Sequence, residues 1–368
     1  MNGLVASESV CSGHPDKICD RISDSIVDAA LRVDPLARVA VETLVTENRI
    51  VLAGEVTCKQ ELPYENIARE AIKKLGYTNP LFRFTDQSPL SIYIHEQSHD
   101  IAVGVDDEGA GDQGMMYGYA CTETPEYMPL PIAVSHALCK AMDTCREDGT
   151  IPYLRPDGKA EVTIRYEHDA PVELDQVVLA VPYDPIHTKE ELSRALVEHV
   201  IAPVLTSYHL TVPEAKKITI NGTGVWEIGG PASDTGVTGR KIIVDTYGGF
   251  VKHGGGAFSG KDPTKVDRSG AYGCRYVAKN IVATGLATRA EVRVAYVIGL
   301  RDPIAYEVDT FGTNTVSQRE IDAFARKTLS MRVSDILTVL DLRRPIYEKT
   351  SSYGHFGRND VSWEKIVT

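Results

Sequence analysis

A glycine-rich stretch followed by lysines and aspartates, residues 253–268, is the part of the sequence best suited to bind phosphate. It reads HGGGAFSGKDPTKVDR. Glycines let backbone N–H groups approach an anion closely, and the ammonium groups of Lys261 and Lys265 can reach further phosphates. The carboxylates of Asp262 and Asp267 can hold a divalent metal beside them. We interpret the stretch as a polyphosphate-binding loop.

The loop matches a P-loop only in part. Residues 255–261 fit the pattern GxxxxGK, whereas Asp262 replaces the Ser or Thr that would hold magnesium. Pro263 then prevents a helix from running straight through this point. Taken alone, the stretch is either a phosphate loop of another kind or a glycine-rich turn that binds nothing.

The composition indicates a globular protein of several domains. A chain of 368 residues with 43% hydrophobic residues suggests two or three domains. No apolar run approaches the roughly 20 residues of a membrane helix and no signal peptide is recognised, so no membrane partner is expected. The seven cysteines are scattered without a CxxC pair. This favours a reducing, cytoplasmic location and no structural zinc.

The charge distribution points to a small anionic ligand. The net charge of −12 argues against nucleic-acid binding, which needs a basic surface. Six cations nevertheless crowd into residues 240–268. A local basic pocket in an acidic protein suits a small polyanion, and the alternative is an ordinary solvated run of charges.

The spacing of apolar residues predicts an α+β protein. Helices are expected over residues 16–33, 64–75, 129–146, 188–200 and 267–282, with Asp267 as a cap, and another from Ser317, with Glu320 completing a capping box. Strands are expected over residues 39–46, 50–57, 161–168, 177–181, 217–220, 241–245, 291–300 and 306–311. Residues 97–114 are typical of a long, mobile loop. The order lacks a steady βαβ alternation, which favours α+β, with domain boundaries near residues 100 and 228.

The hexapeptide SGHPDK, residues 12–17, is a second candidate phosphate site. It lies at a predicted helix N-terminus, where phosphate binds well. Asp16 is then a candidate magnesium ligand and His14 a donor to a phosphate oxygen. The alternative is a capped helix start in which Asp16 only complements the helix dipole.

Two more glycine-containing motifs are candidates for ligand contacts. GAGDQG, residues 109–114, matches GxGxxG, but acidic residues precede it where a Rossmann fold has a strand. Asp112 is better placed to meet a cation such as a sulfonium, unless the motif is a simple surface turn. In NGTGVW, residues 221–226, Trp226 can stack on a nucleobase, although a single tryptophan is more often part of a core.

Three isolated acids complete the set of candidates. Glu42 and Glu55 lie on the predicted hairpin, and Asp234 lies shortly before the cations at 240 and 241. An acid that faces inward from a strand needs a partner or a metal. Ordinary surface acids are the alternative.

Four ordered motifs together resemble the methionine adenosyltransferase (S-adenosylmethionine synthetase) family of the bacterial and eukaryotic type. The most specific are GAGDQG (109–114) and GGGAFSGKD (254–262). SGHPDKICDRISD (12–24) and TGRKIIVDTYGG (238–249) support them. The resemblance covers essentially the whole chain, so the alternatives for the isolated motifs no longer hold.

The resemblance implies both a fold and a reaction. The fold is three similar α/β sandwich domains about a pseudo-threefold axis, which we place at residues 1–100, 107–227 and 228–368. The reaction is ATP, L-methionine and water giving S-adenosylmethionine, phosphate and diphosphate, with two Mg²⁺ per site and K⁺. The resemblance also implies a homo-oligomer, a tetramer built as a dimer of dimers, with active sites between subunits.

Roles of individual residues are implied in the same way. The implied catalytic residues are His14, Lys159, Arg240 and Lys265. The implied ATP ligands are His14, Asp112, Asp157, Lys159, Trp226, Arg240, Lys241, Ala257 and Lys261. The implied methionine ligands are Glu55, Gln97, Asp234, Lys265 and Ile298. The implied metal ligands are Asp16 and Asp267 for Mg²⁺ and Glu42 for K⁺.

The chain departs from the family pattern in two loops. Residues 221–226 read NGTGVW where the family usually has NPTGRF, which keeps an aromatic residue but loses Pro and Arg. Residues 97–106 read QSHDIAVGVD where the family usually has QSPDIAQGVD. The shape of the adenine loop and the closure of the second loop are therefore in question.

The residue types suit the implied chemistry. A thioether sulfur is nucleophilic without losing a proton, so no Ser-His-Asp relay is needed, and none is visible. The highly charged leaving group calls for metal ions and fixed cations. Two other functions compete with this one: another ATP-dependent kinase or ligase, and a non-catalytic nucleotide-binding subunit.

Overall fold

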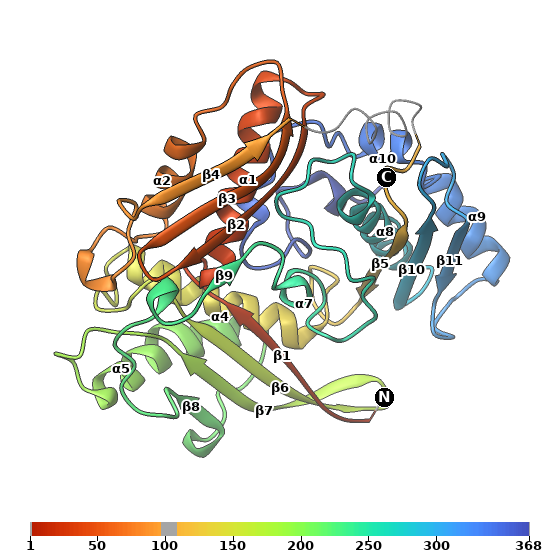
Figure 1. Cartoon of the computed structure of the whole chain (residues 1–368). Coiled ribbons are helices and arrows are strands. Elements are labelled where there is room, and N and C mark those ends of the chain that lie inside the picture. Colours follow the sequence, from red (N-terminus) through yellow and green to blue (C-terminus); the bar gives the residue numbers. More distant parts are fainter. Residues whose placement is uncertain (1, 97–108, 368) are drawn as a thin grey trace.

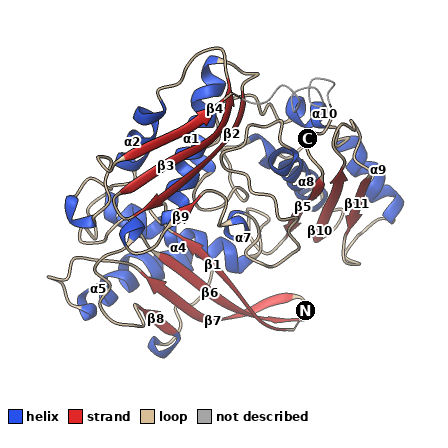
Figure 2. Cartoon of the chain, in the orientation of Figure 1, coloured by secondary structure: helices blue, strands red, loops and turns tan. Residues whose placement is uncertain are grey.

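Three β-sheets with helices packed against them make up the structure, a computed structural model that describes residues 2–96 and 109–367 (Figure 1, Figure 2). The strands are β1 (Gly3–Val10), β2 (Arg38–Thr46), β3 (Arg49–Thr57), β4 (Leu90–His95), β5 (Gly114–Cys121), β6 (Lys159–Glu167), β7 (Ala170–Ala180), β8 (Ile218–Ile220), β9 (Gly236–Val237), β10 (Arg289–Tyr296) and β11 (Ala305–Asp309). The helices are α1 (Pro15–Val33), α2 (Tyr64–Lys74), α4 (Leu130–Glu147), α5 (Lys189–Leu196), α6 (Ala202–Ser207), α7 (Ile242–Asp245), α8 (Val266–Ala283), α9 (Gln318–Thr328) and α10 (Val333–Val339). None of the helices in these residues has the length and apolar character needed to span a membrane.

Each sheet contains one strand from a distant part of the sequence. The strand orders are β4-β3-β2-β9, β1-β6-β7-β8 and β11-β10-β5. β9 therefore completes the sheet of the N-terminal segment, β1 joins the central sheet, and β5 joins the C-terminal sheet (Figure 1). The exchange occurs once per sheet in cyclic order, as expected for three units related by a pseudo-threefold axis.

One long helix covers each sheet. α1 packs on β2, α4 on β1 and β6, and α8 on β5 and β10. The three helices have nearly equal lengths of 19, 18 and 18 residues. One apolar core joins the first and third units, and a second fills the central unit. The predicted α+β class with three similar sheet-and-helix units is confirmed.

α1 begins where its sequence predicts. Pro15 lies in the first turn, where a missing N–H costs nothing, and Nδ1 of His14 accepts the backbone N–H of Asp16 at 3.2 Å. Ile18 and Ile22 recur at helical spacing and are fully buried. The helix therefore holds its first-turn polar side chains on a rigid support.

The predicted hairpin and the predicted capping box are also confirmed. β2 and β3 pair in antiparallel register from Arg38 opposite Thr57 to Thr46 opposite Arg49. α9 begins with a capping box between Ser317 and Glu320. In both places the local signal agrees with the tertiary structure.

The strand predicted over residues 241–245 is wrong. Ile242–Asp245 forms the single helical turn α7, in which the N–H of Asp245 donates to the carbonyl of Lys241 at 2.8 Å. Its β-branched residues favour a strand locally. The buried ammonium of Lys17 donates to Oδ1 of Asp245 at 2.5 Å, and this tertiary contact favours the helical turn.

Two other local details also differ from expectation. Asp267 does not cap α8, because Lys265 occupies the N-cap position and Asp267 accepts a hydrogen bond from Lys261 instead. The helix predicted over residues 188–200 is interrupted by a π-helical turn at Val197–Ile201. Strands β1, β4 and β5 were not predicted. None of them forms a hairpin: β1 pairs with β6, β5 pairs with β10, and β4 lies parallel to β3.

Candidate active site

The first group of predicted site residues gathers at the N-terminus of α1. His14 is buried, and burial together with the charge of Lys241 lowers its pKa to about 3. The imidazole is therefore neutral at pH 7. Because Nδ1 accepts the N–H of Asp16, the proton lies on Nε2, from where it can be donated to a substrate oxygen.

Asp16 is held between a backbone N–H and two cations. It accepts the N–H of Val237 at 3.0 Å and Nζ of Lys241 at 2.7 Å, and Nε of Arg240 lies 3.8 Å from its other oxygen. Burial raises the pKa of Asp16, but the bonds from Lys241 and Val237 outweigh burial and lower it. Lys159, the first residue of β6, adds a positive charge that reaches the neighbouring imidazole.

Asp157 and the segment that carries Trp226 lie beside each other. Asp157 accepts the N–H groups of Gly158 at 2.7 Å and of Gly230 at 2.8 Å, and burial raises its pKa to about 6. The indole Nε1 of Trp226 donates to the carbonyl of Ile228 at 2.8 Å. Asp157 and Ile228 line a common pocket, so both segments contribute to one cavity wall.

The second group gathers on the glycine-rich loop before α8. The carbonyl of Gly260, whose φ is +83°, accepts the N–H of Val41 at 3.0 Å, so the loop runs close along β2. A Cβ at Gly260 would lie 2.2 Å from the carbonyl oxygen of Val41. Nζ of Lys261 donates to Oδ2 of Asp267 at 2.6 Å. A Cβ at Gly256 would lie 2.3 Å from Oδ1 of Asp267, so glycine is required there too.

Lys265 and Asp262 form a second ion pair in the same loop. Nζ of Lys265 donates to Oδ2 of the fully buried Asp262, which also accepts the N–H of Val39 at 2.7 Å. Burial raises the pKa of Asp262, but the charge of Lys265 outweighs burial and lowers it. Asp262 therefore anchors the loop to β2 as a carboxylate.

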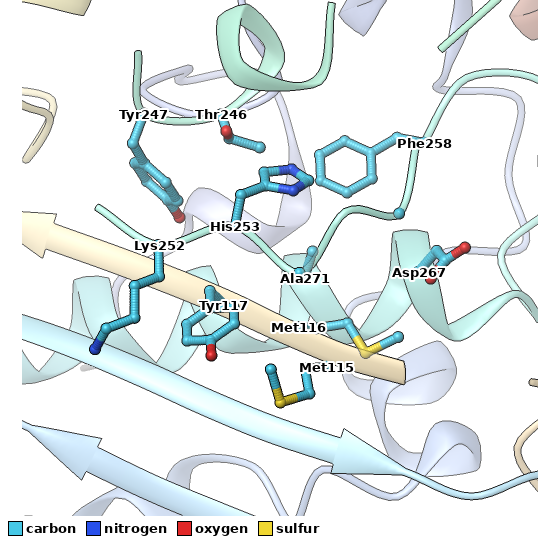
Figure 3. A pocket seen from close by; sticks show the side chains of 12 residues that line it. Met115, Met116, Tyr117, Thr246, Tyr247, Lys252, His253, Phe258, Asp267 and Ala271 are labelled. Carbon is cyan, nitrogen blue, oxygen red and sulfur yellow. The ribbon is translucent and has the colours of Figure 1, made fainter. Parts of the chain in front are cut away.

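Asp267 also lines a pocket beside the loop. The other walls include Met115 and Met116 from β5 and His253 and Phe258 from the loop itself (Figure 3). Asp267, the predicted magnesium ligand, thus lines this pocket and is also paired with Lys261.

Glu42 and Glu55 project from the face of the first sheet that is turned away from α1. The buried positions of β2 alternate with Glu42, which is exposed. Burial and the charge of Glu55 raise the pKa of Glu42, whereas the charge of Lys261 opposes the rise. Glu55 lies 3.5 Å from Nε2 of His95. Glu42 is therefore within electrostatic reach of Lys261 in the glycine-rich loop, and Glu55 is within reach of Glu42.

Asp112 and Ile298 are brought together by main-chain contacts between their segments. Ala110 donates to the carbonyl of Leu300 at 2.9 Å, and Gly299 donates to the carbonyl of Ala110 at 2.8 Å. Asp112 and Ile298 are both exposed, with 59% of Ile298 accessible. Both side chains are therefore accessible to a ligand at the surface.

Three more predicted site residues are Asp234, Ala257 and Gln97. Asp234 is exposed just before β9. Ala257 lies against Gly239, directly before the cations at 240 and 241: a Cβ built on Gly239 would lie 2.6 Å from the Cβ of Ala257. Gln97 lies outside the described residues, as does the whole of the altered loop at residues 97–106.

Within the described part of the chain, no hydrogen bond or ion pair joins a side chain of the first group to one of the second. The first group is His14, Asp16, Lys159, Arg240 and Lys241. The second group is Lys261, Asp262, Lys265 and Asp267. The side chains are therefore paired within each group and not between the groups, although Gly239 of the first segment lies next to Ala257 of the glycine-rich loop.

A row of four buried aspartates on α1 was missed by the sequence analysis. Asp16, Asp20, Asp24 and Asp28 stand four residues apart on one face of the helix. Each accepts one or two backbone N–H groups from the C-terminal part of the chain, at residues 237, 239, 260 and 347–348 respectively. The repeat DxxxDxxxDxxxD was the available signal. α1 thus holds both cationic loops.

Comparison with known proteins identifies the family. Models of the S-adenosylmethionine synthetase N-terminal, central and C-terminal domains match residues 2–99, 107–226 and 228–365. The chain belongs to the S-adenosylmethionine synthetase family. An S-adenosylmethionine synthase of Desulforudis audaxviator (strain MP104C) is 49% identical over 380 residues, which cover 99% of this chain and 96% of that protein.

The donor set of this S-adenosylmethionine synthetase family member suits a hard divalent cation. Asp16 and Asp267 offer carboxylate oxygens, the ligand type that Mg²⁺ prefers, and each already attracts a cation, Lys241 or Lys261. No group of three or more His, Cys, Asp or Glu side chains converges among residues 2–96 and 109–367. Asp16 and Asp267 would thus each offer one carboxylate to a metal ion, with phosphate oxygens and water supplying the other ligands.

Proposed function

We propose that the protein forms S-adenosylmethionine by attack of the methionine sulfur on C5′ of ATP, followed by cleavage of the triphosphate. Family membership supplies the overall reaction, with ATP and L-methionine as substrates. The observation that carries the mechanism is the pairing of lysines with aspartates in both groups, Lys241 with Asp16 and Lys261 with Asp267. Such groups suit a triphosphate with its metal ions.

The first step needs a stabilised leaving group more than a base. The sulfur lone pair forms the S–C5′ bond while the C5′–O bond breaks, and the triphosphate leaves with that electron pair. Neutral His14 donates its Nε2 hydrogen to the oxygen that joins C5′ to the triphosphate. Lys159, Arg240 and Lys241 stabilise the developing charge from one side, and Lys261 and Lys265 from the other.

In the second step, water attacks a phosphoanhydride bond of the bound triphosphate, giving phosphate and diphosphate. The same cations hold the chain of phosphates in place, so both steps use one electrostatic site. Asp16 and Asp267 would hold two Mg²⁺ and Glu42 would hold K⁺. When bound, these ions supply positive charge to the triphosphate.

Substrate recognition is assigned to the residues at the edges of the two groups. Asp157, Trp226, Ala257 and Asp112 are proposed to contact the adenosine part of ATP. Glu55, Asp234, Gln97, Lys265 and Ile298 are proposed to contact methionine. Carboxylates suit its ammonium group, and an apolar side chain suits its thioether.

We propose an active site assembled from two copies of the chain, since among the described residues no side chain of the first group pairs with one of the second. We propose a homotetramer, a dimer of dimers, in which the first group of one copy faces the second group of its partner. The proposed domains are residues 1–100, 107–227 and 228–368, which the ranges of the three family models support. A cytoplasmic location is proposed from the seven free cysteines, of which six are buried.

The test is an assay of the purified protein with ATP, L-methionine, Mg²⁺ and K⁺. The expected products are S-adenosylmethionine, phosphate and diphosphate in equal amounts. ADP or AMP with an activated acid would instead indicate a kinase or ligase. ATP binding without any product would indicate a non-catalytic subunit.

A further inference from the structure

The carboxylate of Asp24, in the middle of α1, collects four hydrogen bonds from the glycine-rich loop and from α8. Arg268 donates from both terminal nitrogens, at 2.7 and 2.9 Å. Oγ of Ser259 donates at 3.1 Å and the N–H of Gly260 at 3.0 Å. The side chains of Asp24 and Arg268 are both 0% exposed. A bidentate pair in such surroundings determines orientation as well as distance.

Asp24 and Arg268 also contact the backbone at Lys261, the proposed phosphate-binding cation. Nη1 of Arg268 also donates to the backbone carbonyl of Lys261 at 2.9 Å, and its guanidinium carbon lies 4.0 Å from the ring centre of Tyr347. Asp24 holds the N–H of Gly260, the residue directly before Lys261. The backbone on both sides of the Lys261 side chain is therefore bound to this buried pair.

β2 also holds the loop, through backbone hydrogen bonds. Val41 donates to the carbonyl of Gly260 at 3.0 Å, and Asp262 donates to the carbonyl of Val39 at 3.0 Å. The loop thus pairs with β2 along its backbone and is bound by Asp24 of α1 as well. These contacts with β2 are made by backbone groups. Those of Asp24 and Arg268 are made by charged side chains that belong to the helices α1 and α8.

We propose that Asp24 is a positioning residue for the adenosyl transfer: with Arg268 it sets the place of Lys261 and so the affinity for the triphosphate. The inference rests on the proposed function, because it takes Lys261 as a phosphate-binding cation. Asp24 touches no substrate, since Arg268, Ser259 and Gly260 occupy its carboxylate oxygens. It acts by holding the lysine in register with the phosphates.

Asp28 offers a matched control on the same face of the same helix. Its carboxylate is buried and accepts the N–H groups of Tyr347 at 2.9 Å and Glu348 at 3.0 Å. It therefore ties α1 to the C-terminal segment but holds no residue of the glycine-rich loop, and it reaches the buried pair only indirectly, through Tyr347, whose ring packs on Arg268. A role in folding alone would be shared by Asp24 and Asp28, whereas a positioning role belongs to Asp24.

The experiment compares Asp24→Asn with Asp28→Asn in the full-length protein. Binding of inorganic tripolyphosphate is measured by calorimetry, and kcat and KM for ATP are measured separately. Asp24→Asn is expected to weaken tripolyphosphate binding about 10-fold, the loss of one charged hydrogen bond. We expect kcat/KM for ATP to fall about 100-fold, as for a displacement of about 1 Å. Asp28→Asn is expected to leave both within about 3-fold of the wild type while lowering thermal stability.

Ser259→Ala keeps the inference testable if Asp24→Asn does not fold. It removes one hydrogen bond to the carboxylate and leaves the buried pair with Arg268 intact. We expect about 2- to 10-fold weaker tripolyphosphate binding and a higher KM for ATP, with unchanged secondary structure.

Equal losses in Asp24→Asn and Asp28→Asn would overturn the inference, as would wild-type tripolyphosphate binding by Asp24→Asn or by Ser259→Ala. The proposed function is judged separately, from formation of S-adenosylmethionine by the wild type. A wild type that makes S-adenosylmethionine beside an Asp24→Asn variant with normal phosphate binding rejects the positioning role alone. Tripolyphosphate binding can be measured without turnover. It therefore tests whether Asp24 positions Lys261 even if the wild type forms no S-adenosylmethionine.

Discussion

Lys241 donates its Nζ hydrogen to Oδ2 of Asp16 at 2.7 Å, across 225 positions of sequence. The same relationship recurs in the second group, where Lys261 binds Asp267 at 2.6 Å. In each case a proposed phosphate-binding cation neutralises a proposed metal ligand. Without substrate, each of these two carboxylates is thus paired with a lysine. On binding of ATP with Mg²⁺, each pair would separate: the lysine would bind a phosphate and the aspartate would bind a metal ion.

Replacing Lys241 by Met should tighten metal binding in the absence of ATP. The variant frees Asp16 from its partner and removes a positive charge that repels the ion, so we expect about 10-fold tighter binding of Mn²⁺ as a probe. Titration of Mn²⁺ followed by paramagnetic resonance measures this, with Lys217→Met, which removes a surface pair to Glu173, as the control. Equal Mn²⁺ affinity in the two variants would contradict the exchange of partners.

Replacing Lys265 by Ala should slow formation of S-adenosylmethionine or cleavage of triphosphate about 100-fold or more, because one preorganised cation is lost. Single-turnover measurements separate the two steps. Lys349→Ala, which removes an exposed pair with Asp360, is the control and should remain active. Near-normal rates for both steps in Lys265→Ala would exclude Lys265 from the site.

Buried His136 should make the protein sensitive to acid. Burial, with the charges of Lys17 and Arg358, lowers its pKa from an unfolded value of 6.5 to about 3. The folded state therefore holds the neutral form. Its contribution to stability is complete above pH 6.5 and is lost as pH falls toward 3, by at most about 5 kcal/mol. Nε2 has no hydrogen-bond partner among the described residues, so protonation gains no acceptor.

His136→Gln should accordingly lose less stability than the wild type between pH 7.5 and pH 4.5, as measured by urea unfolding at each pH. His199→Gln, at an exposed position, is the control and should follow the wild type. Parallel loss of stability in all three proteins would show that His136 does not contribute.

Trp226 should contribute to ATP affinity through its ring. Trp226→Ala is expected to raise KM for ATP about 5- to 100-fold, the usual effect of removing one stacked aromatic residue. Trp226→Phe is the matched comparison, because both variants lose the hydrogen bond to Ile228 and only the ring differs. Equal KM values in the two variants would remove Trp226 from the adenine site.

Local signals accounted for much of the fold. The helix of Ile18 and Ile22, the hairpin of β2 and β3, and the capping box of Ser317 and Glu320 follow from spacing and short-range hydrogen bonds. Strands β1, β5 and β9 could not be assigned to sheets in this way. Their partners lie in other units, and a short strand carries no signal for a distant partner.

The sequence by itself determined the family, the reaction and the residue types of the site, because four glycine-rich and charged motifs specify them together. Only the tertiary structure decided how these residues are paired. Asp24 reads as one more polar residue on a helix, yet it anchors the loop of Lys261, because folding brings residues 24 and 260 together. The turn at Asp245 changed from an expected strand to a helix for the same reason, since its buried partner Lys17 lies 228 positions away. Long-range electrostatic contacts in a buried environment outweigh local preference, and no sequence pattern encodes their geometry.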